Sequence, residues 1–140
     1  MKKIGMQAWA LICFLVLMIS VSGAQEVGLR VDIPFNFNVA KKVLPAGHYL
    51  ILAPSSELLK IVGPDGGTAI AITNRVRDRR PQGIGAVIFN CYGRRCFLSR
   101  FWIDGTESGQ ELLQGHLERE VAKETSQVAV LMLKGTPVDR

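Results

Sequence analysis

Two closely spaced cysteines are the first residues in the sequence that suggest chemistry. Cys91 and Cys96 enclose the turn-prone stretch 92–95 and lie between two apolar runs. Thiols this close together pair in an oxidising compartment. We therefore expect a structural disulfide across the end of a β-hairpin, contributing about 2 kcal/mol because the closed loop is small. The spacing is not the C-x-x-C of redox-active pairs, and a zinc site needs a second pair of ligands that this stretch lacks.

The two histidines, His48 and His116, are the candidates for acid–base chemistry. A catalytic histidine needs a nucleophile or a carboxylate beside it. We expect His48 to be exposed or half-buried at the start of a strand, and His116 to begin a helix on a solvated face with Glu118 and Glu120. The sequence has no G-x-S-x-G, H-E-x-x-H, P-loop or dinucleotide-binding motif. It therefore predicts a protein that is not an enzyme and holds no cofactor or metal ion.

Arginines are the sharpest charged feature, and four of them crowd into the segment 75–80. Guanidinium groups bind carboxylates and phosphates through paired donors, so clustered arginines suit an anionic glycan or a lipid surface. The alternative is a loop that its charge keeps soluble, with Asp78 partly neutralising it. Arg100 and the turn between the cysteines enlarge the patch if they lie at the same end of the domain. The candidate anion-binding residues are Arg75, Arg77, Arg79, Arg80, Arg94 and Arg95.

Four aromatic residues are candidates for a sugar-binding platform: Tyr49, Tyr92, Phe101 and Trp102. Phe101 and Trp102 are consecutive in an expected strand, so they point to opposite faces. We expect at least one of the two to lie in the core.

The first 24 residues have the three parts of a secretory signal peptide. Lys2 and Lys3 precede an uncharged apolar run over residues 8–21, and a small-x-small site ends at Ala24. The run of about 14 residues is shorter than the ~20 that cross a bilayer, although an uncleaved membrane anchor is the competing interpretation. We predict a signal peptide over residues 1–24 and a single β-rich domain over residues 25–140, exported to the periplasm or the extracellular space.

The charge of the exported part restricts its partners only mildly. Lys2 and Lys3 belong to the signal peptide, which leaves 15 of the 17 basic side chains against 12 acidic ones. This small excess permits an anionic polysaccharide or lipid, or an envelope protein, as partner. An exported protein does not ordinarily meet nucleic acid, so we expect no nucleic-acid partner.

Alternating apolar residues predict strands along most of the chain. From 29 to 39 every odd position is apolar, which places one face of a strand on the core and the other in water. Pro34 cannot donate to a ladder and suggests an edge strand or a bulge. The stretch 65–67 has the residues that close a hairpin. Further strands are expected at 48–53, 57–63, 68–73, 84–90, 96–103 and 127–134, the last of them buried.

One stretch has the pattern of a helix, with Leu117 and Val121 four residues apart in the segment 115–125. A longer helix that begins with a capping box at Ser108 and Glu111 is the alternative, but Gly115 weakens its middle, so we favour the shorter one. The fold class is all-β: a single β-sandwich or small partly open barrel of about seven or eight short antiparallel strands, with one short helix near the C-terminus.

The stretch VDIPFNFNVAKKVLPAGHYLI at 31–51 resembles the N-terminal signature of a group of small exported bacterial proteins. In that group a V-x-[IV]-P-F-x-F strand precedes L-P-A-G-x-Y, and the similarity continues through CFLSRFWIDGTESGQEL and LERE over most of residues 25–140. Members often have Leu-Pro and a Ser before the helix, where this sequence has Leu112, Leu113 and Gly115. The resemblance implies an exported β-rich domain and carries no catalytic or binding residue over to this chain.

Three classes of function fit this sequence. The first is a non-catalytic interaction module of the cell envelope or the extracellular space, with binding of an anionic glycan or lipid surface as its variant. The second is an enzyme whose site the sequence does not show, which a cleft with converging polar side chains favours. The third is a structural subunit that adds an edge strand to a partner, which an unprotected edge at 29–39 favours.

We predict that the mature protein begins at Gln25. The full chain, expressed in a bacterium with a normal secretion pathway, is expected to lose its first 24 residues because a signal peptidase cleaves after a small-x-small site. Intact-mass measurement checks this result. A full-length product in the membrane fraction contradicts it.

Overall fold

The structure is a computed structural model that describes residues 27–77, 85–103, 105 and 108–138. The predicted signal peptide lies outside these ranges, within which the chain forms eleven strands and one helix. In chain order the elements are β1 (Val27–Ile33), β2 (Phe37–Val39), β3 (Lys42–Leu44), β4 (Gly47–Ser55), β5 (Leu58–Val62), β6 (Thr68–Arg77), β7 (Ala86–Tyr92), β8 (Arg95–Trp102), β9 (Ser108–Leu112), α2 (His116–Glu124), β10 (Ala129–Lys134) and β11 (Thr136–Pro137).

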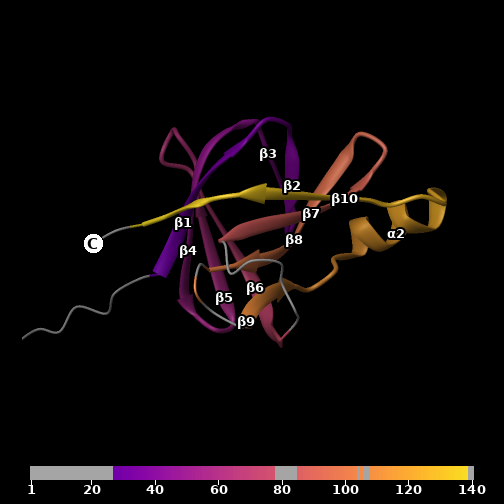
Figure 1. Cartoon of the computed structure of the whole chain (residues 1–140). Coiled ribbons are helices and arrows are strands. Elements are labelled where there is room, and N and C mark those ends of the chain that lie inside the picture. The colour runs from indigo at the N-terminus through magenta and orange to yellow at the C-terminus, as the bar shows by residue number, and fades with distance from the viewer. Residues whose placement is uncertain (1–26, 78–84, 104, 106–107, 139–140) are drawn as a thin grey trace, which may run out of the picture.

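The strands form one mixed sheet that curls into a partly open barrel (Figure 1). Along the sheet the order is β10-β7-β8-β9-β6-β5-β4-β1-β11. β6 pairs with β5 through residues 68–72 and with β9 through residues 73–77, so it passes from one half of the sheet to the other. The C-terminal strand, by which we mean β10, Gly135 and β11 together, does the same, because β10 pairs with β7 and β11 pairs with β1. Two strands thus join the two halves.

The predicted continuous strand over 29–39 is wrong in one respect, because the chain leaves the ladder at Pro34. β1 ends at Ile33 and β2 begins at Phe37. Proline has no N–H for a ladder, and its ring restricts the residue before it. The predicted alternation nevertheless holds across the break: Phe35 is half-buried and packs against the core, and the other odd residues are buried, at Leu29, Val31, Ile33, Phe37 and Val39.

The all-β class with one short helix is confirmed, but the sheet has eleven strands and is not purely antiparallel. The additional strands are the short β2, β3, β9 and β11. After the break at Pro34, β2 runs parallel to β8, with Phe37 opposite Cys96. Its other edge pairs with β3. The break therefore turns the second half of the predicted strand into a separate neighbour of β8.

The predicted disulfide between Cys91 and Cys96 is present at the end of the β7–β8 hairpin. The two residues lie directly opposite each other in the ladder. Gly93 adopts φ 63°, a left-handed conformation that glycine tolerates best, and so allows the tight turn between them. Both cysteines are buried in the main core, as expected of a structural pair.

Aromatic rings fill the interior around Phe37. Its ring centroid lies 5.0 Å from that of Tyr49 and 5.5 Å from that of Phe89, in edge-to-face contacts. Phe35 makes a similar contact with Phe89 at 5.1 Å. These rings bring together β2, β4 and β7, which are distant in sequence, so they hold both halves of the sheet to one core.

The sugar-binding platform considered from the sequence is not formed, because all four of its residues are buried. Tyr49 and Phe101 belong to the main core. Tyr92 packs against Phe97 on the outer face of the β7–β8 hairpin. Trp102 is 2% exposed, although it follows Phe101 and points to the other face of β8. These rings contribute packing rather than a surface for a ligand.

The helix α2 covers the outer face of the β7–β8 hairpin, where Val121 and Ala122 pack against Tyr92 and Phe97. Its bounds confirm the shorter of the two predicted helices. The longer alternative is wrong, because Ser108 begins the strand β9 instead. Among the residues that the structure describes, no helix has the length and apolar character needed to cross a membrane.

We predict that Phe37→Ala lowers the free energy of unfolding by about 3–5 kcal/mol, because it leaves a cavity in the centre of the core. Phe35→Ala is expected to cost clearly less, because its half-buried ring leaves a site that water and neighbours can fill. Denaturant unfolding at constant m-value measures both changes. Exposed Lys41→Ala is the control. Equal losses for the two phenylalanines contradict this description of the core.

Candidate functional site

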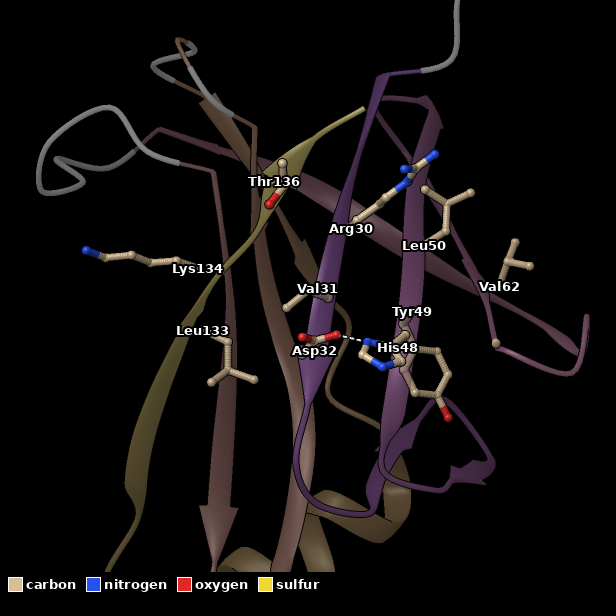
Figure 2. A pocket seen from close by; sticks show the side chains of 11 residues that line it. Arg30, Val31, Asp32, His48, Tyr49, Leu50, Val62, Leu133, Lys134 and Thr136 are labelled. Atoms are coloured by element: carbon tan, nitrogen blue, oxygen red, sulfur yellow. Dashed lines mark hydrogen bonds and ion pairs between the residues drawn. The ribbon is translucent and has the colours of Figure 1, made fainter. Parts of the chain in front are cut away.

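A groove of about 760 Å³ lies where β1 and the C-terminal strand separate (Figure 2). β1, β4, β5 and the C-terminal strand all contribute to its lining. Figure 2 shows β10 diverging from β1 below Thr136, with Val31 and Leu133 between the two strands. We call this feature the β1–β10 groove.

Backbone geometry explains which groups face the groove. In an antiparallel ladder, the N–H and C=O groups of successive residues face the two neighbouring strands alternately. The N–H of Val138 donates to the carbonyl of Gly28, so the even residues of β1 direct these groups at the C-terminal strand. The N–H of Gly135 donates to the carbonyl of Gly85, so the odd residues of the C-terminal strand face β7. Its even residues therefore face β1.

The ladder between β1 and the C-terminal strand stops early. Its last pair is Arg30 with Thr136. The next even residue of β1, Asp32, has no strand opposite it on this side within the described ranges, and Pro34 after it has no N–H to offer. On β10 the backbone groups of Val130 and Met132 likewise point away from β7, on the side of the strand that faces β1. The groove is thus bordered by two strand edges that no described strand covers.

The side chains of β10 are exposed on both faces of the strand. Val130 and Met132 are 65% and 50% exposed on one face, and Leu131 is 40% exposed on the other. The prediction that this strand is buried is therefore wrong. It lies at the end of the sheet path, where β7 alone pairs with it, so its apolar side chains are covered from one side only. Apolar groups exposed along a strand edge are a typical surface for pairing with another chain.

A histidine–carboxylate pair lies in the same groove. His48 Nδ1 bonds to Asp32 Oδ1 across the β1–β4 ladder (Figure 2), which places His48 as expected, exposed at the start of a strand. The two side chains are 85% and 76% exposed. No hydroxyl or thiol of the described residues hydrogen-bonds to the His48 ring, so the pair lacks the nucleophile of a catalytic triad. Arg30 and Lys134 add positive charge to the groove lining.

The predicted arginine patch is not formed, because its described residues lie at opposite ends of β8. Arg77 lies opposite Ser108, next to the end of β8 marked by Trp102. Arg95 begins β8 beside the disulfide turn, at the opposite end of that strand. Arg75 is therefore near Arg77 but far from Arg94 and Arg95, whereas Arg79 and Arg80 lie outside the described residues. Arg100 lies between the two ends, where its Nε is 3.5 Å from Glu111 Oε1.

Glu118 is the buried carboxyl group that sequence reasoning placed on a solvated face. It is 8% exposed on the face of α2 that covers the β7–β8 hairpin, and it accepts a hydrogen bond from the hydroxyl of Tyr92 at 3.2 Å. Burial raises the pKa of Glu118 above its ordinary value of 4.5, although hydrogen bonds from Tyr92, Asn90 and Gln114 favour the charged form. His116 is exposed at the start of the helix, 3.9 Å from Glu120.

Function has to be inferred from the geometry of the structure, because comparison with known proteins finds no match. No protein-family model matches the chain, and no curated protein or solved structure is similar enough to count as a match. The described residues contain no group of three or more His, Cys, Asp or Glu side chains that could hold a metal ion. The groove and its open strand edges are accordingly the candidate functional site.

The buried carboxyl predicts a pH dependence of stability. Because its pKa is raised in the folded state, the folded protein binds this proton more tightly than the unfolded chain does. The contribution of Glu118 is therefore largest below about pH 4.5 and declines as pH rises through the raised pKa. Glu118→Gln keeps an acceptor for Tyr92 and removes the charge, so its free energy of unfolding is expected to rise relative to that of the wild type across this interval. Urea unfolding at several pH values measures the difference; Glu120→Gln on the exposed face is the control.

Proposed function

We propose that this protein is an exported, non-catalytic interaction module that binds an extended segment of a partner protein of the cell envelope or extracellular space. The segment would add a strand to the edge of β10 in the β1–β10 groove. The observation that carries the proposal is the pair of strand edges that no described strand covers, one on β10 and one on β1 beyond Arg30.

The edge of β10 has the features of strand addition. Backbone groups of Val130 and Met132 point away from β7 and toward the unpaired side of β10, so an incoming strand gains main-chain hydrogen bonds at both residues. The strand carries no charge before Lys134, and its side chains are exposed on both faces. A partner strand therefore covers apolar surface on each face as it pairs, without desolvating a charge.

The edge of β1 restricts the register of the partner. Pro34 removes the donor that a second neighbour needs there, and the Asp32 side chain is held by His48. Proline and charge of this kind limit unspecific pairing at sheet edges. The segment is consequently expected to pair with β10, while Arg30 and Lys134 in the lining favour acidic residues in it.

Met132→Pro tests the proposal. It removes an N–H on the unpaired side of β10 and leaves the ladder to β7 intact, because the odd residues of β10 make those bonds. Wild-type protein immobilised on a resin is expected to retain a partner from envelope extract of the organism that encodes it. Met132→Pro is expected to retain at least about tenfold less, because a backbone hydrogen bond is lost and the ring obstructs the edge.

Ile70→Lys is the control, since Ile70 is 63% exposed on β6 and does not line the groove. It is expected to retain the partner fully. Circular dichroism and an unchanged unfolding midpoint establish that Met132→Pro is folded. The proposal is wrong if every protein that the wild type retains is retained equally by Met132→Pro. A dimer that this substitution converts to a monomer identifies the partner as a second copy of the chain.

A further inference from the structure

A second cavity, of about 330 Å³, opens at the end of the barrel where β4 turns into β5. The start of β1, the end of β4 and the neighbouring ends of β6, β8 and β9 form its walls. It shares no lining residue with the β1–β10 groove. The mouths of small barrels are common places for ligand sites, and this volume is at the lower end of the range for such pockets, about 300–1,000 Å³.

Hydrogen bonds hold the floor of this cavity, which we call the mouth cavity, in place. Phe101 is fully buried, and Gln110 lies directly opposite it in the β8–β9 ladder. The side-chain amide of Gln110 donates to the carbonyl of Ser55 at 2.8 Å, and its oxygen accepts from the hydroxyl of Thr73 at 3.1 Å. The backbone N–H of Thr73 also donates to the carbonyl of Glu57, at 2.8 Å. These bonds fix the β4–β5 turn against β6 and β9, so the cavity keeps its shape without a ligand.

Arg75 is the charged residue of the lining. It lies opposite Gln110 in the β6–β9 ladder, so its side chain leaves the sheet on the same face as Gln110 and Phe101, toward the cavity. Its side chain has no hydrogen bond or ion pair with a described residue, in contrast to Arg100, which pairs with Glu111. A guanidinium that pairs with no described residue and lies beside a cavity offers its paired donors to a carboxylate.

Apolar side chains make up much of the remaining wall. Val27, Ala53, Pro54 and Ile103 surround the opening, and Phe101 lies at its base. A ligand that satisfies both parts of the lining needs an anionic head for Arg75 and an apolar body for the cavity. A polysaccharide chain fits this lining poorly, because its hydroxyl groups would be desolvated against apolar walls.

We propose that the mouth cavity binds a monocarboxylate with an apolar body of medium length, whose carboxylate pairs with Arg75 while its chain lies over Phe101. The site is separate from strand addition in the β1–β10 groove, so either function stands if the other fails. Of the arginines that were singled out from the sequence and that the structure describes, Arg75 alone lines this cavity.

Titration calorimetry with sodium octanoate tests the proposal on protein purified after expression of the full chain. We expect saturable binding with one site per chain. Arg75→Gln is expected to weaken it at least tenfold, because a charge-assisted pair of hydrogen bonds is lost. Arg77→Gln is the matched control, since Arg77 is on the same strand and outside the lining. It is expected to leave the affinity within twofold.

Two further ligands separate the contribution of the carboxylate from that of the apolar chain. 1-Octanol has the same chain without the charge, and sodium acetate has the charge without the chain; both are expected to bind at least tenfold more weakly than octanoate. Arg75→Glu is expected to lose octanoate and to bind octylammonium. Absence of saturable octanoate binding overturns the proposal, and so does equal weakening by Arg75→Gln and Arg77→Gln. Arg75 is exposed, so unfolding is not expected, and an unchanged midpoint verifies this for each variant.

Discussion

The fold depends on the passage of the C-terminal strand from one half of the sheet to the other at Gly135. This residue alone separates β10, which pairs with β7, from β11, which pairs with β1. A Cβ added to Gly135 would lie 3.1 Å from the side chain of Leu29, a residue with no exposed surface. Without a side chain at this position, the strand passes close enough to β1 to close one side of the barrel.

That closure is incomplete, and its limits explain the candidate site. The strand pairs with β1 for two residues at Leu29 and Arg30 and then diverges. Further along β1, Pro34 ends the strand and sends the chain to β8. Because of this one proline, an edge of β1 stays open and the residues after it form β2, the parallel neighbour of β8. The open groove is a consequence of the same residue that shapes the core around Phe37.

Much of the fold could be predicted from local patterns. The odd residues from Leu29 to Val39, the disulfide between Cys91 and Cys96, and the extent of α2 all follow from spacing, because strand faces, hairpin ends and helix faces are local properties. The exposure of β10 could not be predicted, since an apolar run indicates burial only if both edges and both faces have neighbours. The burial of Glu118 and the separation of the arginines likewise depend on which elements meet, and no residue spacing encodes that.

The position of the closing strand also determines when the barrel can form. Leu29 pairs with Pro137, so the contact that closes one side joins the two ends of the described chain. Contacts between residues so distant in sequence carry a large loop-closure cost and form late in folding. The hairpins from β4 to β8 involve only residues that precede this strand, so they can form before it becomes available. Until it arrives, β7 and β1 both present unpaired edges, and the chain is most exposed to aggregation in that interval.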